Sequence, residues 1–144
     1  MKTISKLFAT FILCFSTQVF AQSADSREVI WLTDTQRTAV LAEMRQFLTA
    51  SQQILAASLD ENPDAIEAAA RPMGIKSMKG TPQSLREKLP SGFGQLGSKT
   101  HQGFEEIANE AVGMGDTSII LRQLSELQKN CIACHARYQL KATP

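Results

Sequence analysis

The chain has 144 residues, a length typical of one domain, and 43% of them are hydrophobic. Its 15 basic and 14 acidic residues nearly cancel, and no basic patch interleaved with aromatic residues stands out. This balance disfavours nucleic acid as a partner.

The first 21 residues are typical of a secretory signal peptide. Lys2 and Lys6 precede a short apolar run, LFATFILCF over residues 7–15, and residues 19–21 (VFA) form a cleavage pattern of the small-x-small kind. The apolar run is too short to span a bilayer, so we expect a cleaved signal and no stable membrane anchor. A buried N-terminal helix and a retained anchor are the alternatives. The predicted location is the periplasm.

Cleavage after Ala21 would leave residues 22–144 as the mature domain. Loss of the two lysines of the signal takes the 15 basic residues to 13 against 14 acidic ones, a formal net charge of −1. Cleavage would also remove Cys14, so Cys131 and Cys134 would be the two remaining cysteines. An oxidising compartment makes two unexplained free thiols improbable, so this pair calls for a function.

The first predicted helix covers residues 34–59. Hydrophobic spacing favours helices throughout the mature chain, and no alternating strand pattern is convincing. Thr33 and Gln36 have the spacing of a capping box, which places the start of this helix. Its expected apolar stripe consists of Leu41, Met44, Leu48, Leu55 and Leu59.

The middle of the chain predicts one short helix and then an irregular segment. Residues 62–63 (NP) combine a cap with a proline for the first turn, and residues 71–72 (RP) should end that helix. Prolines and glycines punctuate residues 72–94, where one or two helical turns are expected over residues 82–88.

Two further long helices are predicted over residues 95–113 and from Asp116 or Thr117 through Tyr138. Short connections between amphipathic helices favour antiparallel neighbours, so the expected fold is all-α, an antiparallel four-helix bundle. The third helix carries its stripe on Phe93, Leu96, Thr100, Phe104, Ile107, Ala111 and Met114. The last helix carries Ile120, Leu124, Leu127, Cys131, Cys134 and Tyr138 on one stripe.

The motif that carries chemistry is NCIACHARY at residues 130–138. On a continuous helix, Cys131 and Cys134 are three residues apart, and His135 is four residues after Cys131, so all three side chains project from one side. Covalent haem attachment requires two thiols that reach the two vinyl groups and an imidazole beneath the iron. The spacing C-x-x-C-H is therefore interpreted as a site for one covalently attached haem c, with His135 as axial ligand.

Three other chemistries can use two cysteines and a histidine at this spacing. A structural zinc site requires four nitrogen or sulfur ligands, and His101 is the one further soft candidate in the mature chain. A thioredoxin-like dithiol lies beside a strand in a βαβ unit, which this sequence does not suggest. A plain disulfide stays open, although it leaves the histidine and the apolar stripe before it unexplained.

The motif and its place near the C-terminal end of a helical chain resemble the class II c-type cytochromes, the cytochrome c prime family. Cys131, Cys134, His135 and the aromatic Tyr138 carry the resemblance, and length and helix order extend it over the mature chain. The resemblance implies a four-helix bundle with haem packed against Tyr138. It is also in keeping with a homodimer through the first two helices.

The resemblance assigns the other haem face to the first helix. There, an arginine near a haem propionate is followed four residues later by the distal side chain, and Arg37 and Leu41 have this spacing. Met44 is a possible sixth ligand, because a small rotation of the helix would aim its sulfur at the iron. A solvated charge for Arg37, an ordinary core leucine for Leu41 and a core filler for Met44 are the alternatives.

Two positions complicate this assignment. The family usually carries Arg or Lys four residues after the ligand histidine, and this chain has Gln139 there, so Arg137 or Lys141 would have to supply the charge. His101 lies one position off the stripe of its helix. We expect it to be a surface or interhelical hydrogen-bonding residue, because a second axial histidine would displace the first-helix side chain.

The expected function is electron transfer in the periplasm with redox partner proteins, and no enzymatic activity. The alternative is a five-coordinate haem protein that binds nitric oxide or carbon monoxide for sensing or scavenging, because an apolar Leu41 would leave one iron face open.

Overall fold

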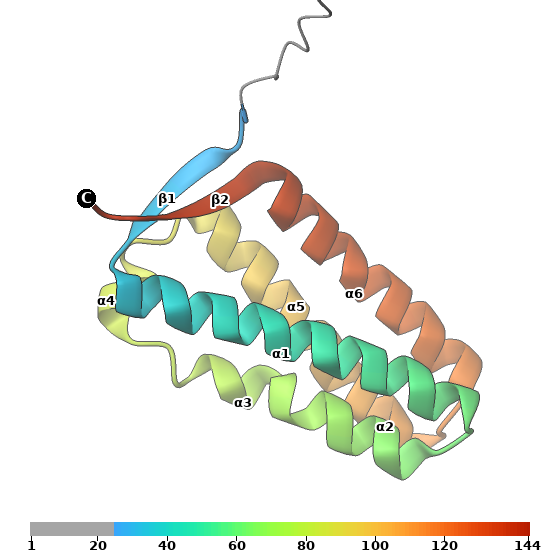
Figure 1. The fold of residues 1–144 in the computed structure, drawn as a ribbon. Helices are drawn as coiled ribbons and strands as arrows, with labels where there is room; N and C mark the ends of the chain where they lie inside the picture. The colour runs from blue at the N-terminus through green and yellow to red at the C-terminus, as the bar shows by residue number, and fades with distance from the viewer. Residues whose placement is uncertain (1–24) are drawn as a thin grey trace, which may run out of the picture.

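The computed structural model describes residues 25–144 and is mostly helical (Figure 1). The predicted signal peptide lies outside these residues. No helix among them is both long and apolar enough to cross a bilayer. The elements in chain order are β1 (Glu28–Leu32), α1 (Asp34–Leu59), α2 (Pro63–Ala70), the 3₁₀ turn η1 (Arg71–Met73), α3 (Ile75–Met78), α4 (Gln83–Arg86), α5 (Ser91–Gly113), α6 (Thr117–Arg137) and β2 (Tyr138–Ala142).

Side-chain caps begin three of these helices as predicted. At α1, Thr33 Oγ1 accepts from the Gln36 amide at 3.2 Å, and Gln36 Oε1 accepts from the Thr33 amide at 3.1 Å. Asn62 Oδ1 accepts from the Ala65 amide at the start of α2. Asp116 caps α6 through the amides of its first turn. Each cap satisfies amides that the helix itself leaves without partners.

A parallel pair of short strands was not predicted. β1 and β2 pair from Glu28 with Tyr138 to Leu32 with Ala142, and Ile30 and Leu32 are buried. Val, Ile and Trp favour a strand in β1, but a five-residue segment gains stability only when its distant partner is in place. The pairing also ends α6 at Arg137, before Tyr138.

The start of α5 corrects a second prediction. The helix begins at Ser91, whereas the glycines at positions 92 and 94 suggested an irregular segment up to residue 94. A Cβ at Gly92 would lie 2.5 Å from the Tyr138 hydroxyl oxygen. Gly92 therefore makes room for the tyrosine and does not break the helix. Within 72–94, α4 lies inside the predicted turns at 82–88.

The predicted stripe of α1 is wrong for three of its four leucines. Leu48, Leu55 and Leu59 are exposed, and the buried stripe lies one residue earlier at each position, at Phe47, Ile54 and Ser58. One residue rotates the buried face by about 100°. Both stripes repeat at helical spacing. Small side chains select the buried stripe, because they allow neighbouring helices to approach closely; these residues are Ala50, Ser51, Ala57 and Ser58. Met114, expected on the α5 stripe, is exposed as well.

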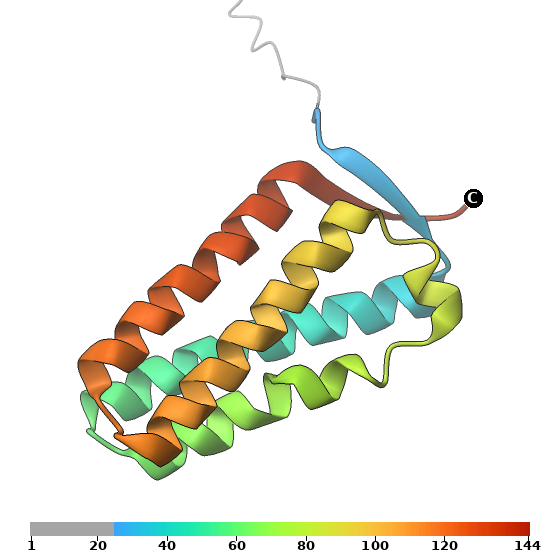
Figure 2. The same ribbon diagram turned by 180° about the vertical axis from the view of Figure 1, so that it is seen from behind.

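The helices enclose two hydrophobic clusters. α5 packs against α2 and α6, and α1 packs against α2 and, less extensively, α6; α5 and α6 run side by side in Figure 2. The larger cluster includes Phe47, Ile54, Phe104, Ile107 and Ile120. The smaller cluster lies beside the strands and includes Ile30, Leu32, Val40, Leu85 and Tyr138. Met44 packs against both clusters, so it marks where the two meet.

Candidate functional site

A pocket of about 550 Å³ lies between α1, α5 and α6. Its volume is in the range of ligand and cofactor sites. The chain contains two histidines, and both line this pocket together with both cysteines of the predicted mature domain. Protein interiors are otherwise closely packed, so a pocket of this size beside two core clusters is a candidate ligand site.

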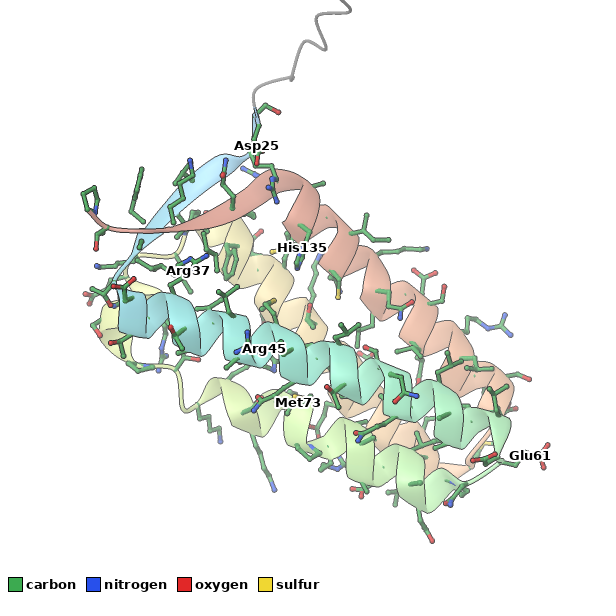
Figure 3. The ribbon with its side chains drawn as sticks, viewed as in Figure 1. Asp25, Arg37, Arg45, Glu61, Met73 and His135 are labelled. Atoms are coloured by element: carbon green, nitrogen blue, oxygen red, sulfur yellow. The ribbon has the colours of Figure 1, made fainter. Side chains whose placement is uncertain are left out.

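The last two turns of α6 supply the motif. Cys131, Cys134 and His135 all line the pocket, as their spacing predicted. Cys131 packs against the larger cluster and Cys134 against the smaller one. In Figure 3, His135 lies on the side of α6 that faces α1 and α5. Its carbonyl oxygen accepts from Arg27 Nη1 at 3.3 Å, a bond that satisfies one of the free carbonyls at the end of the helix.

The cysteines are free, half-buried thiols. Burial raises the pKa of both, and the nearby Cys131 further raises the pKa of Cys134. A redox-active dithiol requires a lowered pKa, so the dithiol alternative loses support. Among residues 25–144, no cluster of three or more His, Cys, Asp or Glu side chains is arranged to hold a metal ion. The described residues thus offer no four-ligand zinc site.

From the first helix, Leu41 and Met44 line the same pocket. Both are half-buried. The structure therefore brings the two residues expected on the distal side to the wall of the pocket that holds the cysteine–histidine motif. Leu48 lines the rim and is 72% exposed.

Arg37 is not among the residues that line the pocket. Its Nε donates to the carbonyl oxygen of Leu140 at 3.3 Å, and Figure 3 places it at the start of α1 beside β2. Arg45 is the one Arg or Lys among the described residues that line the pocket. A cation that could pair with a carboxylate of a bound group is thus present two turns further along α1 than expected.

Tyr138 lies behind the pocket wall. It is buried, and its ring meets the ring of Phe93, which does line the pocket, with centroids 5.5 Å apart. The guanidinium of Arg137 lies 5.2 Å from the centroid of the tyrosine ring. The buried Tyr138 hydroxyl has no hydrogen-bond partner in the part of the chain that the structure describes. Tyr138 therefore supports the aromatic wall of the pocket.

Sequence reasoning missed much of the α5 wall. Phe93, Leu96 and Thr100 were assigned to an ordinary apolar stripe, and His101 was placed outside the site. His101 is buried, which excludes the surface location, while its hydrogen bonds to other elements agree with an interhelical role. Its position, one residue away from an apolar stripe, is the one sequence signal that could have indicated it.

The residues present fit a covalently attached haem. Two accessible thiols and an imidazole lie on one wall, and apolar side chains from α1 and α5 form the others. Such a lining is typical of cofactor sites, which are mostly apolar with a few polar groups that fix orientation. No protein-family model, curated protein or solved structure matches the chain.

Proposed function

We propose that the mature chain is a c-type haem protein of the cytochrome c prime kind that transfers electrons in the periplasm. The observation that carries the proposal is that both cysteines of the mature domain and both histidines of the chain line one apolar pocket. The exported location rests on the sequence pattern of residues 1–21.

In this proposal, Cys131 and Cys134 hold one haem c through thioethers, and His135 is its axial ligand. Haem supplies a one-electron Fe(II)/Fe(III) couple when bound. The chain's own residues would bind the haem, orient it and shield it from water. The apolar walls around Leu41 and Phe93 keep water from the site, and Arg45 offers a positive charge at its edge.

The proposed architecture is an antiparallel four-helix bundle, in which α1, α2 with its continuation into α3, α5 and α6 are the four members. Short connections support it, because residues 60–62 join α1 to α2 and residues 114–116 join α5 to α6. Short links of this kind favour antiparallel neighbours.

The rim of the pocket supports electron transfer. Leu48 and Ile132 line it and are 72% and 70% exposed, and His135 is exposed as well. An apolar rim at the surface lets a redox partner approach the site closely, and exposed apolar patches often mark such contacts. We propose that partner proteins dock here transiently.

The competing proposal is gas binding at a five-coordinate iron. Leu41 favours it, since a leucine in the pocket wall cannot ligate and would leave an apolar open face for nitric oxide or carbon monoxide. The two proposals share the same haem site and differ in what occupies the distal side.

The test is expression with export and a cytochrome c maturation system, followed by intact-mass analysis and a pyridine haemochrome spectrum. We expect a mass increase of one haem that survives denaturation, and reversible reduction of the purified protein. A protein that gains no haem, or that carries a Cys131–Cys134 disulfide, contradicts the proposal. Rapid carbon monoxide binding by the reduced protein would favour the competing function.

A further inference from the structure

His101 is a buried histidine in the pocket that the proposed function leaves without a role. It is 6% exposed and lies in the middle of α5. A buried imidazole requires hydrogen-bond partners or a ligand. Its two nitrogens have different surroundings, and this difference indicates what the residue does.

The Nδ1 atom of His101 is held by two oxygen atoms. It lies 2.8 Å from the carbonyl oxygen of Met73 and 3.0 Å from Ser77 Oγ. A carbonyl can only accept, and the Ser77 hydroxyl donates its own hydrogen to the Gly74 carbonyl at 2.8 Å. Both partners are therefore acceptors, so Nδ1 carries the hydrogen. A neutral imidazole in this tautomer has a free lone pair on Nε2.

The Nε2 atom lies on the opposite side of the ring. Its nearest charged neighbour is Glu43 Oε1 at 3.6 Å, beyond hydrogen-bond range, and Glu43 also lines the pocket. The ring is fixed further by an edge contact with Phe47, with centroids 5.1 Å apart. His101 is thus oriented by its Nδ1 hydrogen bonds and its aromatic neighbour, while Nε2 has no hydrogen-bond partner among residues 25–144.

This arrangement is the one that metal-bound histidines have. A ligating imidazole donates its other ring N–H to a backbone carbonyl or carboxylate, which sets the tautomer and orients the ring. His135 lines the same pocket from α6. Two imidazoles from different helices on one pocket can bind an iron from its two sides.

We propose that His101 is the second axial ligand of the haem iron, opposite His135. This inference rests on the proposed haem site and replaces Leu41 and Met44 as the residues that define the distal side. It makes the iron six-coordinate and low-spin at rest, which favours electron transfer over gas binding.

The competing explanation is structural. A protonated His101 could pair with Glu43 of α1 while its Nδ1 bonds hold α5 against η1 and α3, with no contact to iron. Glu43 is about one-third exposed, so its carboxylate is free to turn to solvent. Glu43→Gln removes the pairing charge and leaves the imidazole in place. It therefore separates the two roles of His101.

The experiment compares the holoprotein with His101→Ala, Met44→Leu and Glu43→Gln variants by absorption and electron paramagnetic resonance spectra. We expect a low-spin wild type, low-spin Met44→Leu and Glu43→Gln variants, and a high-spin His101→Ala variant that binds carbon monoxide when reduced. Added imidazole should restore the low-spin spectrum of His101→Ala, which a structural role would not produce. Should His101→Ala fail to fold, His101→Met keeps a ligand and should give a low-spin protein with a higher reduction potential.

Two results overturn the inference while the haem proposal stands. One is a high-spin wild type, and the other is a low-spin spectrum that is lost in Met44→Leu and kept in His101→Ala. Absence of a Soret band from the wild type instead contradicts the haem proposal itself, so the two failures are distinguishable.

Discussion

Gly94 and Gly97 offer a matched pair of positions on α5. A Cβ added at either residue meets no atom within 4 Å, but Gly97 lines the pocket and Gly94 does not. Inside a helix, glycine costs about 1 kcal/mol relative to a good helix former such as leucine. Leucine at either position therefore stabilises the helix by a similar amount, and the two variants differ in what the new side chain meets.

In the holoprotein, the two substitutions should have different effects. Gly94→Leu should raise the free energy of unfolding by about 1 kcal/mol through helix propensity. A leucine at position 97 enters the volume that we assign to haem, and overpacking of this kind costs about 1–3 kcal/mol. Gly97→Leu should therefore be less stable than Gly94→Leu by about 1–3 kcal/mol, a difference of several degrees in melting temperature.

The assay is thermal unfolding of both holoproteins at equal haem content, followed by far-ultraviolet circular dichroism and by the Soret band. Both probes should report the lower midpoint for Gly97→Leu. Equal stabilisation by the two leucines would refute the reasoning, because it means that nothing in the pocket opposes the side chain at position 97. Greater stabilisation by Gly97→Leu would mean that the leucine itself fills the pocket.

Three further predictions concern the thiols and the helix cap. The Cys131→Ser/Cys134→Ser double variant should lose all covalent haem and unfold at a lower temperature than the holoprotein, because nothing then fills the pocket, as followed by haem-stained denaturing gels and circular dichroism; an unchanged midpoint would contradict this. In the folded haem-free chain, burial raises the pKa of both thiols above the ordinary value. The folded state therefore keeps its full stability below about pH 9, where the thiols are neutral, and loses stability as pH rises through the raised pKa and the thiols ionise. Alkylation by iodoacetamide at pH 8 should accordingly be slower in the folded haem-free chain than in urea, and an equal or faster rate would mean that the thiols are not shielded. Asp116→Ala removes the cap of α6 and should lower stability by about 0.5–2 kcal/mol in urea unfolding, whereas an unchanged midpoint would show that the cap contributes nothing.

Local signals in the sequence predicted the helix starts well. Thr33, Asn62 and Asp116 each accept from amides a few residues away, so their effect is complete within one turn. The face shared by Cys131 and His135 is local in the same sense, because helical spacing alone determines it. These features did not depend on the rest of the fold.

Features that depend on distant residues were missed. β1 is paired with β2 across more than a hundred residues, and Gly92 appears as a chain breaker until the Tyr138 hydroxyl is placed next to it. The buried face of α1 was displaced by one residue, because both candidate stripes repeat at helical spacing. Only the packing of neighbouring helices selects Phe47 over Leu48.

The candidate site also combines local features, which the sequence predicted, with a residue whose role depends on distant segments. The α6 wall follows from one nine-residue motif. Leu41, which the resemblance placed on the distal side, lines the pocket, and so does Met44. His101 does not belong to any local motif. Its orientation depends on Met73 and Ser77, which come from η1 and α3 in the segment that sequence reasoning described least well. A histidine oriented from such a segment could be recognised as a candidate ligand only once the chain was folded.

The most direct test of the haem site is a crystal structure of the exported protein with anomalous diffraction data collected at the iron absorption edge. We expect one iron peak inside the pocket between α1, α5 and α6, with His135 Nε2 bound to it and continuous density from Cys131 and Cys134 to the haem. An iron peak elsewhere, or a Cys131–Cys134 disulfide and no iron peak, would contradict a haem site in this pocket.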